Sequence, residues 1–94
     1  MAVDPGEIRA LVRGLLTSHW LDTSRLSIMY ARGALRVNGE LRKLPGVGVR
    51  EIRPRFLDEL ELELRRVEGV KRVHLGFSNW VRYGTGWAPW PSEG

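Results

Sequence analysis

Apolar residues occupy every second position over most of the stretch from residue 26 to residue 41. The alternating positions are Leu26, Ile28, Tyr30, Leu35, Val37 and Leu41. A period of two is typical of a strand that buries one of its faces. The pair Arg32-Gly33 keeps the two runs in phase, as the two-residue turn of a tight hairpin does. The pattern therefore predicts an antiparallel hairpin, with strands 26–31 and 34–41 and with Gly39 as a bulge inside the second strand.

A competing interpretation of this stretch is a meander with strands 26–31, 34–37 and 40–43. Asn38-Gly39 is a strong turn dipeptide because both residues tolerate positive φ, whereas Arg32 suits such a turn poorly. The alternation stays intact if Gly39 is a bulge, so the single hairpin is the favoured interpretation.

Two other segments have the periodicity of amphipathic helices. The first begins at Asp4-Pro5, a capping residue followed by a proline suited to the first turn, and its apolar stripe extends to about Trp20. The second begins at Pro54 and ends before Gly69. Its stripe consists of Phe56, Leu57, Leu60, Leu64 and Val67.

A third alternating run, from Val70 to Phe77, predicts one more strand. We therefore expect an α+β domain over residues 4–83 with the element order αββαβ, in which two helices cover one face of a three-stranded mixed sheet. Residues 84–94 contain three glycines and two prolines, GTGWAPWPSEG, so we expect an irregular, Trp-rich tail there.

Charge is distributed unevenly along the 94 residues, whose net charge is +4. Residues 32–55 contain seven basic and two acidic groups, for a net charge of +5, whereas residues 56–69 contain two basic and five acidic groups, for −3. Such polarity indicates an anionic partner or self-association. We expect a cytoplasmic protein as the chain is given, or one of the periplasm or cell envelope if a signal peptide was removed.

The residues that catalysis requires are not grouped in this sequence. There is no cysteine, and His19 and His74 lie far apart without a metal-ligand pattern around them. Gly46-Val47-Gly48 is too short for a nucleotide-binding loop. The carboxylates are concentrated on the second helix, where solvation explains them better than acid–base chemistry does. We therefore expect no enzyme, no cofactor and no metal site.

The face of the sheet that points away from the helices is the better candidate for binding. Alternation directs Arg36 and Arg42 outward, and in a third strand that continues past Phe77 it also directs Trp80 and Arg82 outward. With Lys43, these five residues are the predicted site for an anion or a lipid. Arg and Trp suit lipid headgroups, and they suit single-stranded nucleic acid equally well. The competing interpretation is that Trp80 covers its own domain and that the arginines only keep the protein in solution.

Three aromatic residues at the C-terminal end form a second candidate site, for a protein partner. They are Tyr83, Trp87 and Trp90. Exposed aromatic residues in an irregular tail are characteristic of interfaces. Alternatively, the tail folds back over its own domain.

The apolar and glycine positions together resemble the BON domain, a small bacterial module named after osmotic-shock and nodulation proteins. The resemblance covers about residues 4–77. It rests on Ile28, Tyr30, Gly33, Leu35, Val37, Gly39 and Leu41, followed by Gly69, Val70, Val73 and Leu75. It implies a non-catalytic module that binds phospholipid or other proteins, usually in the cell envelope. A small basic nucleic-acid-binding protein is the alternative, and a structural subunit that self-assembles through a sheet edge or the tail is the second alternative.

Overall fold

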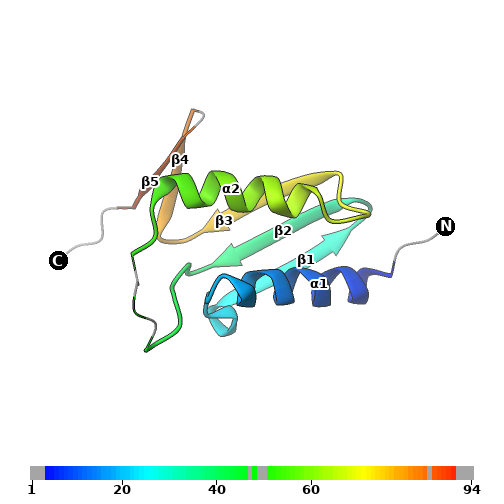
Figure 1. Cartoon of the computed structure of the whole chain (residues 1–94). Coiled ribbons are helices and arrows are strands. Elements are labelled where there is room, and N and C mark those ends of the chain that lie inside the picture. Colours follow the sequence, from blue (N-terminus) through cyan, green and yellow to red (C-terminus); the bar gives the residue numbers. More distant parts are fainter. Residues whose placement is uncertain (1–3, 47, 49–50, 85, 91–94) are drawn as a thin grey trace.

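The computed structural model describes residues 4–46, 48, 51–84 and 86–90, and Figure 1 shows how its helices and strands are arranged. The elements, in chain order, are α1 (Pro5–Ser18), a short 3-10 helix η1 (Thr23–Arg25), β1 (Leu26–Ala31), β2 (Ala34–Gly39), α2 (Pro54–Arg65), β3 (Arg72–Phe77), β4 (Trp80–Tyr83) and β5 (Gly86–Pro89).

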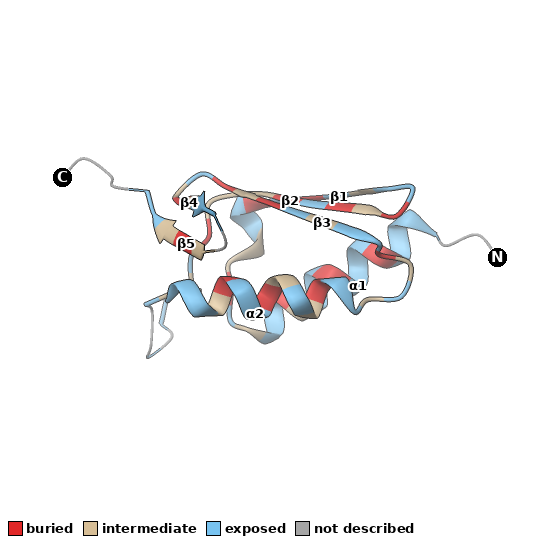
Figure 2. Ribbon diagram, turned by 90° about the horizontal axis from the view of Figure 1, so that it is seen from above, coloured by how far each residue is buried: buried red, intermediate tan, exposed pale blue. Residues whose placement is uncertain are grey.

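The main sheet has three strands in the order β1-β2-β3. Strands β1 and β2 are antiparallel, and β2 and β3 are parallel. Because parallel neighbours need a crossover, α2 connects β2 to β3 over one face of the sheet. Both helices lie on that face, and the described elements leave the other face uncovered (Figure 2). The predicted α+β class, the order αββαβ over residues 4–77 and the mixed sheet are confirmed.

The β1–β2 hairpin closes through the two residues Arg32 and Gly33. Their φ angles are 51° and 83°, as a two-residue turn with positive φ at both positions requires. The predicted hairpin is therefore confirmed and the meander is wrong. Residues 40–43 form no strand, and the pairing recorded for them is an isolated bridge between Lys43 and Leu21.

Gly39 ends β2, so the predicted bulge and continuation to residue 41 are wrong. Its φ is 124°, and a Cβ atom there would lie 2.2 Å from the carbonyl oxygen of Arg25. Only a glycine fits this position, because it has no Cβ atom and adopts positive φ without strain. The chain can therefore leave the sheet here.

The hydrophobic core lies between the sheet and the two helices. Side chains of α1 and α2 pack against every second residue of the strands. The central members of this core are Ile8, Val12, Leu16, Ile28, Leu35, Val37, Leu57, Leu60, Leu64 and Leu75. None of the helices in the described part of the chain is long and apolar enough to cross a membrane.

Helix α1 ends at Ser18, two residues before the predicted end. Trp20 has a φ of 63°, and its N–H donates to the carbonyl of Thr17 at 2.9 Å. The N–H of Leu21 donates to the carbonyl of Leu16 at 3.3 Å. This pair of bonds is the Schellman arrangement that closes a helix.

The C-terminal segment forms a hairpin, so the prediction of an irregular tail is wrong for residues 86–89. Strand β3 ends at Phe77, and after a two-residue connection the chain continues as β4, which pairs with β5 in a second sheet. The hairpin packs on α2 and contributes Trp80 and Trp87 to the core. The predicted domain boundary at residue 84 falls within this hairpin, and residues 85 and 91–94 of the predicted tail lie outside the described part.

Candidate anion-binding face

The uncovered face of the three-stranded sheet is here called the open sheet face. It consists of the strand residues that alternate with the core positions: Ser27, Met29, Ala31, Ala34, Arg36, Asn38, Arg72, His74 and Gly76. Their neighbours in sequence point to the helices because successive side chains of a strand point to opposite faces. The two arginines of this face, Arg36 and Arg72, are exposed, and so is the imidazole of His74.

The strand register places these groups next to one another. Arg36 of β2 lies between Met29 of β1 and His74 of β3. Arg72 lies opposite Ala34, and this pair is next to the Arg36–His74 pair on the same face. The centre of the open sheet face is therefore a row that runs from a half-exposed methionine through a guanidinium to an imidazole.

Small residues surround this row. Ser27, Ala31 and Ala34 carry short side chains, and Gly76 carries none. A Cβ atom at Gly76 would lie 2.4 Å from Oδ1 of Asn38, so the amide of Asn38 occupies the space above this glycine. The open sheet face is therefore broad and nearly flat, and the arginine and methionine side chains project from it. A surface of this shape suits an extended partner.

The cations of this face are not neutralised by neighbouring carboxylates. The three strands contain no Asp or Glu. Within the described residues, neither Arg36 nor Arg72 forms an ion pair. Two more cations, Arg32 and Lys71, lie at the hairpin end of the sheet, where Lys71 donates its N–H to the carbonyl of Gly33 at 2.7 Å. They too form no ion pair in that part of the chain.

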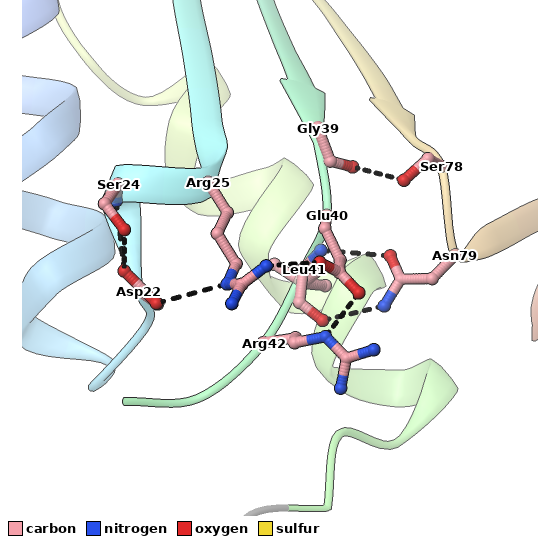
Figure 3. A network of polar contacts seen from close by, with 9 residues as sticks. All are labelled: Asp22, Ser24, Arg25, Gly39, Glu40, Leu41, Arg42, Ser78 and Asn79. Atoms are coloured by element: carbon pink, nitrogen blue, oxygen red, sulfur yellow. Dashed lines mark hydrogen bonds and ion pairs between the residues drawn. The ribbon is translucent and has the colours of Figure 1, made fainter. Parts of the chain in front are cut away.

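Arg36 is the only one of the five predicted anion-binding residues that lies on the open sheet face, as predicted. Arg42, expected beside it, lies beyond the end of β2 instead. Figure 3 shows that Arg42 belongs to a chain of alternating charges that begins at Asp22 and continues through Arg25 and Glu40. Its Nε atom donates to Glu40.

The pKa values of Asp22 and Glu40, the two acids in this chain of charges, are lowered. A hydrogen bond from the Ser24 hydroxyl is the main cause that lowers the pKa of Asp22. A hydrogen bond from Arg42 is the main cause that lowers the pKa of Glu40. Both carboxylates therefore stay ionised at neutral pH and offset the charges of the two arginines.

Lys43 and Arg82 also have partners within the molecule. The Nζ atom of Lys43 donates to the carbonyl of His19 at 2.8 Å and lies 5.2 Å from the centre of the Phe56 ring. Arg82 donates to Glu61 at 2.8 Å, and its guanidinium lies 5.0 Å from the centre of a Trp87 ring. The prediction that Arg82 points out from the main sheet is wrong because β4 belongs to the second sheet.

The predicted aromatic residues divide into two groups. Trp80 and Trp87 are each 8% exposed, so the expectation that Trp80 lies on the open sheet face is wrong, and Trp87 packs in the core. Tyr83 and Trp90 are 67% and 57% exposed. They are therefore the members of the predicted partner-binding set that stay accessible.

A groove of about 740 Å³ lies where β2 and β3 end. Four predicted site residues, Arg42, Lys43, Trp80 and Trp90, are among the residues that line it. Asn79 holds one side in place, because its amide accepts from the N–H of Leu41 at 3.0 Å and donates to the Leu41 carbonyl at 2.9 Å (Figure 3). The groove is a second, partly aromatic surface, separate from the strand positions of the open sheet face.

Sequence reasoning missed Arg32, Lys71 and Arg72 as candidate binding residues. For Arg72 a signal was present, because it lies two residues before His74, which alternation already places on the outer face. Arg32 and Lys71 come together at the hairpin end through the register between β2 and β3, which the sequence pattern does not specify.

Comparisons with known proteins found no relative of this chain. The chain matches no protein-family model, and searches of curated proteins and of solved structures gave no significant match.

Proposed function

We propose that this protein is a non-catalytic binding module that attaches to an anionic phospholipid surface through its open sheet face. One observation carries the proposal: among the described residues, Arg36 and Arg72 project from this face without a carboxylate partner, while Arg25, Arg42 and Arg82 elsewhere are paired. An arginine that already has an acid beside it gains less from an external anion. The unpaired charges are therefore the ones available to a partner.

The shape and the apolar content of the face support a planar partner. The small side chains around Arg36 allow a flat surface to approach closely. Met29, which is 49% exposed, lies beside Arg36 and can contact the boundary between headgroups and acyl chains. Each Lys or Arg near an anionic leaflet contributes about 1 kcal/mol, so Arg32, Arg36, Lys71 and Arg72 together are sufficient for reversible attachment.

The resemblance to BON domains supports the same function. Residues 4–77 have the αββαβ order that this resemblance implies, and phospholipid or protein binding is the role it suggests. The hairpin β4–β5 is an addition to that pattern. Membership of the family remains part of the proposal.

Single-stranded nucleic acid is the second candidate, and the groove favours it. Trp90 is exposed and lines the groove together with Arg42, which allows a base to stack while a phosphate meets a guanidinium. On the open sheet face, by contrast, the described residues include no Phe, Tyr or Trp on which bases can stack, because Trp80 is buried. The open sheet face, which has the larger unpaired charge, thus offers no aromatic side chain in its described residues on which a base can stack.

Self-assembly through opposite charges is less well supported. The acidic helix α2 has partners within its own chain. Glu61 pairs with Arg65 and Arg82, and Glu63 pairs with His19. Its carboxylates are therefore partly neutralised before a second copy approaches.

Vesicle co-sedimentation tests the proposal with the double variant Arg36→Glu/Arg72→Glu. Both side chains are exposed, so the fold should persist. Removing two cations near the leaflet should weaken binding to vesicles of phosphatidylcholine and phosphatidylglycerol about 30-fold or more, at about 1 kcal/mol for each cation. The control is Arg9→Glu/Arg13→Glu, which makes the same change in charge on exposed positions of α1.

The control variant should bind the anionic vesicles nearly as well as the unmodified protein does. Neither protein should bind neutral vesicles. Fluorescence anisotropy with a labelled oligonucleotide, at the same salt concentration, tests the second candidate. Tight binding of the oligonucleotide without vesicle binding would overturn the lipid proposal. Equal losses in the two double variants would show that only total charge matters and would remove the open sheet face from the argument.

A further inference from the structure

The open sheet face brings three nitrogen-bearing side chains together on adjacent strands. Arg36 and His74 are register partners, and Arg72 is two residues before His74 on the same face. Neighbouring strands lie about 4.8 Å apart, and residues two apart on one strand are separated by about 7 Å. The three side chains therefore begin within reach of a single tetrahedral anion.

Gly76 is the next residue of β3 on the open sheet face after His74. The position that a Cβ atom of Gly76 would occupy is 3.5 Å from Nε2 of His74 and 2.4 Å from Oδ1 of Asn38. The imidazole thus leans over the glycine toward the Asn38 amide. A Cβ atom at residue 76 would displace the Asn38 amide, whereas its distance to the imidazole is an ordinary van der Waals contact.

From this arrangement we infer that Arg36, Arg72 and His74 form a phosphate-binding site that favours a phosphomonoester over a phosphodiester. This inference rests on the proposed attachment of the open sheet face to anionic surfaces. A monoester presents three terminal oxygens, and a diester presents two. Three side chains at neighbouring positions of one exposed face can each engage one oxygen of a bound monoester, and guanidinium groups bind such oxygens through a planar fork.

The charge of the ligand leads to the same choice. Two guanidinium groups close together repel each other, and the described residues offer no carboxylate on these strands to relieve the repulsion. A phosphomonoester carries about −1.5 to −2 charges at neutral pH, so one ligand neutralises both arginines. A diester, with a single negative charge, leaves one of them unbalanced.

Vesicles with the two headgroup types test this inference. One set contains phosphatidic acid, a monoester, and the other contains phosphatidylglycerol, a diester, and the compositions are adjusted to equal zeta potential. The unmodified protein should bind the monoester vesicles about tenfold more tightly, because charge-assisted bonds to the additional oxygen are strong. Arg72→Gln and His74→Ala should each remove most of this preference, whereas Arg13→Gln on α1 should retain it.

A soluble phosphomonoester identifies the source of the ligand. Competition by glycerol 3-phosphate at millimolar concentration would support a site that also accepts free ligands. Lack of competition, together with the headgroup preference, would support a membrane headgroup. Thermal melts check that each variant is folded.

Equal binding to the two vesicle types would overturn the monoester site while leaving attachment to anionic surfaces intact. Failure to bind either type would overturn both proposals. A preference that survives in both Arg72→Gln and His74→Ala would place the selectivity elsewhere and would also refute the site.

Discussion

Replacing Trp87 with alanine tests whether the C-terminal hairpin is part of the folded domain. Trp87 is 8% exposed, its ring centre lies 6.5 Å from that of Phe77, and Arg82 lies against it. Truncating a large aromatic residue in a core costs about 3–5 kcal/mol. The lower end applies here, because Nε1 of Trp87 is buried without a hydrogen-bond partner in the described structure, a cost of about 1–3 kcal/mol that the variant no longer carries.

A loss of about 3 kcal/mol is large for a domain of this size. Domains of 60–100 residues lose about 4–8 °C in melting temperature for each kcal/mol. Trp87→Ala should therefore melt at least about 12 °C below the unmodified protein. Circular dichroism melts, with urea unfolding as a second measurement, provide the test.

Two matched variants separate packing from other effects. Trp87→Phe retains an aromatic ring and removes the unpaired N–H, so it should cost much less than Trp87→Ala. Trp90→Ala changes an exposed residue and should alter the free energy of unfolding by less than about 0.5 kcal/mol. A Trp87→Ala protein that melts within a few degrees of the unmodified one would refute the packing of β5 on α2 and would restore Trp87 as a residue available to a partner.

Two further predictions concern the junction at the end of β2. Gly39→Ala should destabilise the protein by more than about 1 kcal/mol, since the residue has positive φ and its Cβ would lie 2.2 Å from the Arg25 carbonyl oxygen; a urea midpoint equal to that of the unmodified protein would contradict this. The pKa values of Asp22 and Glu40 are lowered in the folded state, so their contribution to stability is present above the ordinary carboxyl pKa of about 4 and is lost as the pH falls below it. Urea midpoints measured from pH 6 to pH 3 should fall at the acid end, and less steeply in Asp22→Asn/Glu40→Gln.

The main sheet was predictable because one of its faces is buried. Alternation identified β1, β2 and β3 closely, since a shift of one residue would expose every core side chain. Where burial ends, the prediction fails. The alternation of β3 was extended past Phe77 to Trp80, but the Ser78-Asn79 connection interrupts the strand and transfers Trp80 to the covered side. Serine and asparagine are favoured in turns, so the sequence does contain a signal for the end of β3.

The hairpin β4–β5 was missed because its composition is typical of irregular segments. Gly84, Gly86 and Pro89 interrupt the period-two pattern, and each of the two strands has only four residues. What stabilises them is long-range: Trp80 and Trp87 pack in the core, and β5 lies against α2. A hairpin this short is marginal on its own, so its sequence alone carries a weak signal.

The candidate site shows a different limit, because a cation is available to a partner only if its own chain does not neutralise it. Strand alternation predicts which way Arg36 points, but it does not predict that Arg82 meets Glu61, a residue 21 positions away, or that Lys43 meets the His19 carbonyl, 24 positions away. Those pairings arise from the packing of α2 against the hairpin and from the bridge between Leu21, in the segment that follows α1, and Lys43. The net charge of +5 in residues 32–55 therefore does not measure the binding surface. In the described part of the chain, β2, β3 and the hairpin end carry cations that form no ion pair, since the three strands of the main sheet contain no acids and no described element covers their outer face.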